Sequence, residues 1–85
     1  MKMYKVREFN ENDWCMCLGA ECFEDGSLPV ILDTMDITIV ADRTGIEVID
    51  ENLEIIEQVQ YQNVNQENAI KKIKMLASCY GMEVE

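Results

Sequence analysis

The stretch ITIVADRTGIEVID, residues 37–50, decides the fold, because two β-prone runs flank the turn residues DRTG at 42–45. Aspartate at the first turn position and glycine at the fourth are typical of a type I turn followed by a left-handed glycine in a hairpin loop. The stretch therefore predicts an antiparallel hairpin. Its register puts four apolar side chains on one face by pairing Ala41 with Ile46 and Ile39 with Val48.

On the N-terminal side, residues 28–32 predict a strand that returns to this hairpin, and Pro29 places the strand at a sheet edge or makes it short. Residues 2–9 alternate loosely between apolar and charged side chains and predict a first strand. Residues 14–23 fit either a strand or a short helix with Asn12 as its N-cap. We favour the strand, because Gly19 would interrupt a helix and Asp25-Gly26 is typical of a two-residue hairpin loop.

On the C-terminal side, residues 53–61 alternate again and predict a strand. Glu57 falls on the apolar side of that strand, which suggests a sheet edge, a twist or a partly helical segment. A helix with Asn65 as its cap and Gly81 as its left-handed end should follow. Its apolar stripe consists of Ala69, Ile70, Ile73, Leu76, Ala77 and Tyr80.

These elements predict a single compact α+β domain over residues 1–85, with a small antiparallel sheet of four to five strands packed against one C-terminal helix. The sheet is a meander of hairpins. Val40 and Ile49 fall on the face opposite Ile39 and Val48, so one helix cannot cover all the apolar side chains. Either residues 14–23 or another chain should shield the second face.

Composition favours a folded acidic protein. The net charge is −10, but 48% of the residues are hydrophobic, which is enough for a core. The N-terminal residues show no signal peptide, and no apolar run approaches the roughly 20 residues of a membrane span. We therefore expect a cytoplasmic protein with reduced cysteines.

Catalytic residue types are scarce. The chain has no histidine, and its two serines and four glycines are scattered without a nucleophile or phosphate-binding motif. Asp33 and Asp36 could form a carboxylate pair, but acidic residues are so frequent here that the pair is weak evidence for catalysis. We expect no enzymatic activity, no catalytic residues and no cofactor.

The four cysteines allow two interpretations. Cys15, Cys17, Cys22 and Cys79 could hold a structural zinc ion if the end of the helix lies beside the N-terminal hairpin. The single residue between Cys15 and Cys17 does not fit a zinc knuckle, which favours two residues. We therefore favour buried free cysteines, with no metal, and keep a small cysteine-ligated zinc domain as an alternative.

Charge is distributed unevenly along the chain. Residues 8–57 contain fourteen acidic residues and one basic residue, whereas the remainder contains six basic and three acidic residues. Such a negative surface repels nucleic acid and anionic membranes and attracts basic protein surfaces. The sequence therefore predicts a module that occupies a basic, nucleic-acid-binding surface of a larger protein. The candidate contact residues are Asp25, Asp33, Asp36, Asp42, Glu47, Asp50, Glu51 and Glu54.

In length, charge and lack of catalytic groups, the chain resembles phage-encoded anti-CRISPR proteins and other nucleic-acid mimics. The resemblance is one of type without a shared motif, so it assigns no residue a role. It implies an inhibitor whose partner is a nucleic-acid-processing complex. The alternative is a structural or oligomeric domain, a homodimer among the options, that uses an exposed apolar sheet face.

Overall fold

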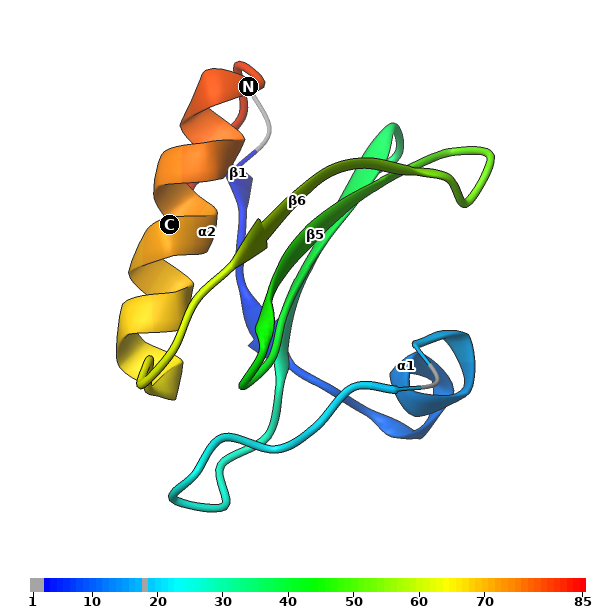
Figure 1. Cartoon of the computed structure of the whole chain (residues 1–85). Coiled ribbons are helices and arrows are strands. Elements are labelled where there is room, and N and C mark those ends of the chain that lie inside the picture. The colour runs from blue at the N-terminus through cyan, green and yellow to red at the C-terminus, as the bar shows by residue number, and fades with distance from the viewer. Residues whose placement is uncertain (1–2, 18) are drawn as a thin grey trace.

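The computed structural model describes residues 3–17 and 19–85. A five-stranded antiparallel sheet in the order β2-β3-β4-β5-β6 forms its centre, and α2 lies across one face of that sheet (Figure 1). The predicted α+β fold, a meander sheet against one C-terminal helix, is confirmed. The elements are β1 (Met3–Tyr4), β2 (Arg7–Glu8), α1 (Glu11–Met16), β3 (Val30–Asp33), β4 (Ile37–Ala41), β5 (Gly45–Asp50), β6 (Ile55–Gln60), α2 (Gln66–Cys79) and β7 (Glu83–Val84).

The central hairpin has the predicted register. Ala41 pairs with Ile46 and Ile39 pairs with Val48. The prediction of a left-handed conformation at Gly45 is wrong, because its φ angle is not positive. The constraint at Gly45 is steric instead. A Cβ atom there would overlap the carbonyl oxygen of Val59 in β6 and lie 3.2 Å from the Val59 carbonyl carbon. Glycine is therefore required by the close approach of two strands rather than by the turn.

The main core lies between the sheet and α2. The Asn65 side chain accepts a hydrogen bond from the backbone of Asn68 at 2.8 Å and begins the helix, and Gly81 ends it with φ +76°. Both predicted ends of the helix are confirmed. The fully buried side chains come from three strands and one stripe of the helix: Val30, Leu32, Ile39, Ala41, Ile46, Val48, Ala69, Ile73 and Ala77, with Phe23 beside them.

The opposite face of the sheet has a smaller core. Phe9, Ile31 and Val40 are buried there, and Trp14 packs edge-on against Phe9 with 5.3 Å between ring centroids. The segment that we expected to be a strand is therefore helical at its start, and α1 covers part of this face through Trp14. The strand prediction for residues 14–23 is wrong. The expectation that this segment shields the second face is confirmed in part, because Ile49 stays partly exposed.

Local hydrogen bonds explain why α1 forms. The Asn10 side chain accepts bonds from the backbones of Asn12 and Asp13, and the Asp13 carboxylate accepts from the backbone of Asn10 at 2.8 Å. This capping box places the N-cap at Asn10, two residues before the expected Asn12. Arg7 adds an ion pair of 2.6 Å to Asp13. Gly19 does not interrupt the helix, because α1 ends at Met16.

We expect Asp13→Asn to destabilise the protein by about 1 kcal/mol at neutral pH, because the variant loses the ion pair with Arg7 and a negative charge in the first turn of α1. The hydrogen bond from Arg7 is the main cause of the lowered pKa of Asp13. A depressed folded-state pKa gives stability that is present above the unfolded value of 3.8 and is lost as pH falls through the folded value. Urea unfolding should therefore show a gap between wild type and variant that is constant above about pH 5 and closes in acid. A gap independent of pH would contradict this role.

Two further strand predictions need correction. The predicted strand over residues 2–9, of which the structure describes 3–9, is divided: β1 pairs in parallel with β7, whereas β2 pairs with β3. The turn at Asp25-Gly26 exists, with φ +88° at Gly26, but the described residues 19–24 that lead into it form no strand. Pro29 stands just before β3, which is four residues long and lies inside the sheet, so the short-strand alternative fits and the edge alternative does not.

Strand β6 forms an exposed edge of the sheet, which agrees with the position of the acidic residue Glu57 on its apolar side. Glu57 pairs with Val48 on the α2 face, where its carboxylate accepts a 2.7 Å hydrogen bond from the Tyr80 hydroxyl. A carboxylate on the apolar face is tolerated because this edge is open to water. None of the helices in the described ranges is long and apolar enough to cross a membrane.

Candidate functional site

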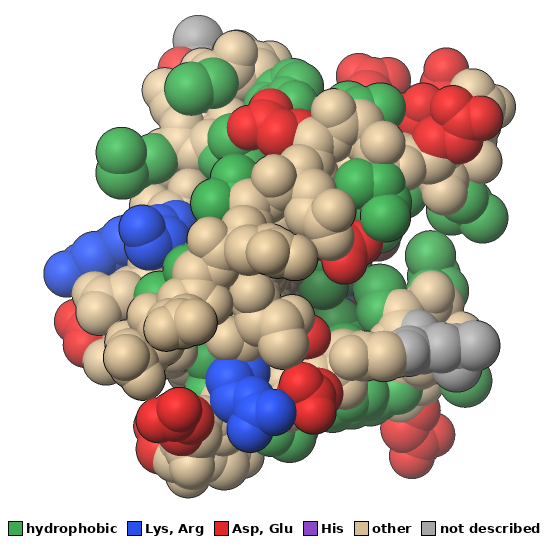
Figure 2. All heavy atoms as spheres, viewed as in Figure 1, with side chains coloured by type: hydrophobic (Ala, Val, Ile, Leu, Met, Phe, Trp, Pro, Cys, Tyr) green, Lys and Arg blue, Asp and Glu red, His purple; other side chains and the backbone are tan. Residues whose placement is uncertain are grey.

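The sheet brings most of the predicted contact residues to one end. Because Ile37 pairs with Asp50, the β3–β4 turn and the β5–β6 turn lie side by side. Acidic side chains crowd this corner, in the upper right of Figure 2. Residues far apart in sequence thus share one surface, which we call the acidic end: Asp33, Asp36, Asp50, Glu51 and Glu54.

The five carboxylates of the acidic end do not have equal roles. Asp50 accepts hydrogen bonds from the backbones of Asn52 and Glu54, both at 2.9 Å, and so shapes its own turn. Asp33 accepts one from the Thr38 hydroxyl at 3.1 Å. No donor within the described ranges reaches the carboxylates of the other three residues, which are exposed: Asp36, Glu51 and Glu54. These three are the carboxylates available to a partner.

Two large apolar side chains project from the same turns. Met35 is 83% exposed and Leu53 is 72% exposed. Leu53 also has φ +65°, a conformation that non-glycine residues seldom adopt. Exposed apolar groups beside charged ones are typical of protein-binding surfaces, which have an apolar centre and a polar rim. Charge alone would not have indicated them.

Asp25 and Asp42 lie near the opposite end of the sheet. Asp25 is exposed, and hydrogen bonds from Ser27 lower its pKa. Asp42 is buried and its carboxylate accepts hydrogen bonds within the fold, so it is less available to a partner than the exposed acids. Its position as the first residue of the turn was the correct signal, because that position favours hydrogen bonds to the following backbone.

The Asp42 carboxylate joins two segments. One oxygen accepts bonds from the backbone and hydroxyl of Thr44, at 2.8 and 2.7 Å, and from the backbone of Gly45 at 3.2 Å. The other oxygen accepts from the backbone of Glu21 at 3.0 Å, which ties the segment after α1 to the hairpin. The Tyr61 hydroxyl donates to the Asp42 carbonyl at 2.6 Å. Burial, with the Asp42 charge, raises the pKa of Tyr61 to about 12.

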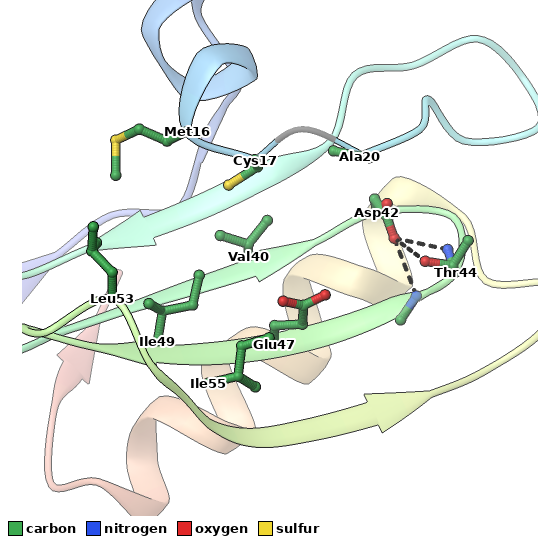
Figure 3. Close-up of a pocket in the computed structure, with 12 residues that line it drawn as sticks. Met16, Cys17, Ala20, Val40, Asp42, Thr44, Glu47, Ile49, Leu53 and Ile55 are labelled. Carbon is green, nitrogen blue, oxygen red and sulfur yellow. Dashed lines mark hydrogen bonds between the residues drawn. The ribbon is translucent and has the colours of Figure 1, made fainter.

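Glu47 lies in a groove on the second face of the sheet, between α1 and the β5–β6 turn (Figure 3). We call this the α1 groove; its volume is about 370 Å³. Its apolar lining comes from α1 and the segment after it, three strands and the turn: Met16, Cys17, Ala20, Val40, Ile49, Leu53 and Ile55. The sequence predicted Glu47 as a contact residue but not the groove, since that required knowing where α1 lies.

The cysteines are not placed as expected. Cys15, Cys22 and Cys79 are exposed, so the prediction that they are buried is wrong for these three, and Cys17 is half-buried. In the part of the chain that the structure describes, no three histidine, cysteine or acidic side chains are grouped so as to hold a metal ion. Burial is the first cause of a raised pKa at Cys17, followed by the charges of Asp13, Glu47 and Asp42. The Cys17 thiol is therefore a weak nucleophile.

Comparison with known proteins adds no family to this description. No protein-family model matches the chain, and neither a curated protein nor a solved structure matches it significantly.

Proposed function

We propose that the protein is a non-catalytic binding module whose acidic end occupies a basic surface of a larger protein. The observation that supports this best is the grouping of Asp36, Glu51 and Glu54, which are exposed and unbonded, around the apolar tips Met35 and Leu53. The lysines of α2 lie on the far side of the molecule, at the left of Figure 2. Arg7 is near enough to Asp33 for the Asp33 charge to raise the pKa of Arg7. Its ion pair, however, is with Asp13, and no ion pair among the described residues involves Asp36, Glu51 or Glu54, so these three carboxylates can meet a cationic partner.

In its sharpest form, the proposal is an inhibitor that mimics nucleic acid. Carboxylates on exposed turns resemble backbone phosphates in charge, and a nucleic-acid-binding surface is built to attract such groups. An anti-CRISPR-like or other phage-encoded role belongs to this class. The partner would be a nucleic-acid-processing complex, with no direct contact to nucleic acid or membrane.

A charge-matched pair of variants tests the proposal. We expect Asp36→Asn/Glu51→Gln/Glu54→Gln to weaken binding of a partner captured from the native host by about tenfold to thirtyfold, since each exposed charge contributes up to about 1 kcal/mol. The control, Glu67→Gln/Glu83→Gln/Glu85→Gln, removes the same net charge elsewhere and should change affinity less than about threefold. Calorimetric titration measures both.

Two competition measurements accompany that pair. Affinity should fall steeply as salt rises, and DNA or RNA should displace the protein from its partner. Equal losses in both triple variants would show that only net charge matters. Affinity that does not change with salt would overturn the electrostatic mechanism.

Self-association through β6 is a second candidate. The edge strand leaves Ile55, Ile56 and Val59 exposed, at 53%, 48% and 43%, beside unpaired backbone groups. Another copy could extend the sheet there. Sedimentation distinguishes the two functions, because salt strengthens association between copies of charge −10 and weakens binding to a basic partner. A monomer at high salt and micromolar concentration would remove this candidate.

A further inference from the structure

The α1 groove exposes apolar side chains on both of its walls. Met16 is 65% exposed on the α1 side, and Leu53 and Ile55 are 72% and 53% exposed on the other side. Val40 and Ile49 line the groove between them (Figure 3). A second, smaller apolar hollow of about 140 Å³ shares Met16, Ile49 and Leu53 with it. An occupant that covers these walls would bury apolar surface that the folded chain leaves in water.

The polar groups of the groove specify the charge of that occupant. Among the residues that the structure describes, its lining contains Asp42 and Glu47 but no lysine or arginine. Asp42 is saturated by backbone and hydroxyl donors, whereas no donor in the described ranges bonds to Glu47. The Glu47 carboxylate is open to solvent and therefore available to a cation, and a lysine or arginine side chain brings its own aliphatic stem to apolar walls.

Position links the groove to the acidic end. Leu53 lines the groove and stands in the same turn as Glu51 and Glu54. A partner seated on the acidic end would therefore reach the groove without a gap. A second copy of the chain is disfavoured here, since it would bring a net charge of −10 to a surface that has no cation of its own.

We propose that the α1 groove receives an aliphatic residue and an adjacent arginine or lysine side chain from a polypeptide segment of the basic partner, with Glu47 pairing the cation and Leu53 covering the aliphatic group. This assignment rests on the proposed function and adds the chemistry of the segment that is recognised. The recognised feature is a cation next to an apolar side chain, not positive charge alone.

The test uses two peptides of equal charge, one alternating arginine with leucine and the other arginine with serine, in a methyl NMR titration of the whole chain. The leucine peptide should bind at least about tenfold more tightly and shift the methyl signals of Val40, Ile49 and Leu53. Leu53→Ser should remove most of that preference. Met75→Ser is the matched control on α2, because Met75 is 71% exposed, and it should leave the preference intact.

A second pair of variants tests the cation. Glu47→Gln should weaken binding of the leucine peptide about fivefold, and Glu83→Gln, an exposed acid on β7, should leave it unchanged. Equal affinity of the two peptides, with shifts confined to the acidic end, would overturn the groove assignment and leave the proposed function standing. Failure of both peptides to bind at low ionic strength would overturn the proposed function as well.

Discussion

Asp42→Ala is expected to lower the free energy of unfolding by about 3 kcal/mol, because four donors lose one charged acceptor. The Asp42 side chain is only 8% exposed, and its carboxylate accepts from the backbones of Glu21, Thr44 and Gly45 and from the Thr44 hydroxyl. Water can reach the emptied site only in part. The hairpin and the segment after α1 should therefore loosen together, which urea unfolding monitored by Trp14 fluorescence would detect.

Asp25→Ala is the matched control for this loss. Asp25 also accepts from the backbone and hydroxyl of a nearby residue, Ser27, but it is exposed to solvent. Its replacement should cost much less stability than that of Asp42, as surface substitutions usually do. Similar losses for both variants would mean that the turn, rather than the burial of Asp42 and its link to Glu21, determines the effect.

Gly45→Ala is expected to destabilise the protein by about 2 to 3 kcal/mol, as overpacking does in tight interiors. The added Cβ would overlap the Val59 carbonyl oxygen and approach the Gln60 Cα to 3.2 Å, so the backbone of β6 must move. Since Gly45 does not have a positive φ angle, the penalty comes from contact and not from the turn conformation. Thermal unfolding should show a lower midpoint, and amide exchange should accelerate along β6.

Gly19→Ala provides the comparison for Gly45. Apart from its neighbours in the chain, no atom of the described residues lies within 4 Å of a Cβ placed at Gly19, and its φ angle is not in the left-handed region. The substitution should change stability by less than about 0.5 kcal/mol. If Gly45→Ala left the stability unchanged, the edge strand β6 would be shown to move easily. The close approach to Val59 would then not be needed for the fold.

The hairpin of residues 37–50 could be predicted because its determinants are local. The alternation of apolar residues and the turn sequence fix the register before any long-range contact is known. The same holds for α2, whose cap at Asn65 and stop at Gly81 are adjacent to its ends. Gly45 was interpreted wrongly because its constraint comes from Val59, which lies in another strand.

The helix α1 could not be predicted from its own residues with the same ease. It is six residues long, and its stability depends on the capping box at Asn10 and on Arg7, which lies outside the segment that we considered. The pattern asparagine-x-x-aspartate at residues 10–13 was a usable signal for the start of a helix. Gly19 favours the strand prediction, but the helix ends before it reaches this residue.

Charge predicted the candidate contact residues, and the structure shows which of them are exposed and close together. Five of the eight share the acidic end, because two turns that are separate in sequence are neighbours in the sheet. Charge could not distinguish Asp42, which serves the fold, from Glu51, which faces solvent. Nor could it show the α1 groove, whose walls belong to elements that meet only after folding.

The parallel pairing of β1 with β7 has a mechanical consequence. Met3 pairs with Glu83 and Tyr4 with Val84, so the first and last strands run in the same direction. A force that pulls on the two ends of the chain would slide these strands past each other and load their bonds simultaneously, instead of opening them one at a time. The β1–β7 pair should therefore resist unfolding when the domain is stretched along the chain. This pair lies well away from the turns that we assign to recognition.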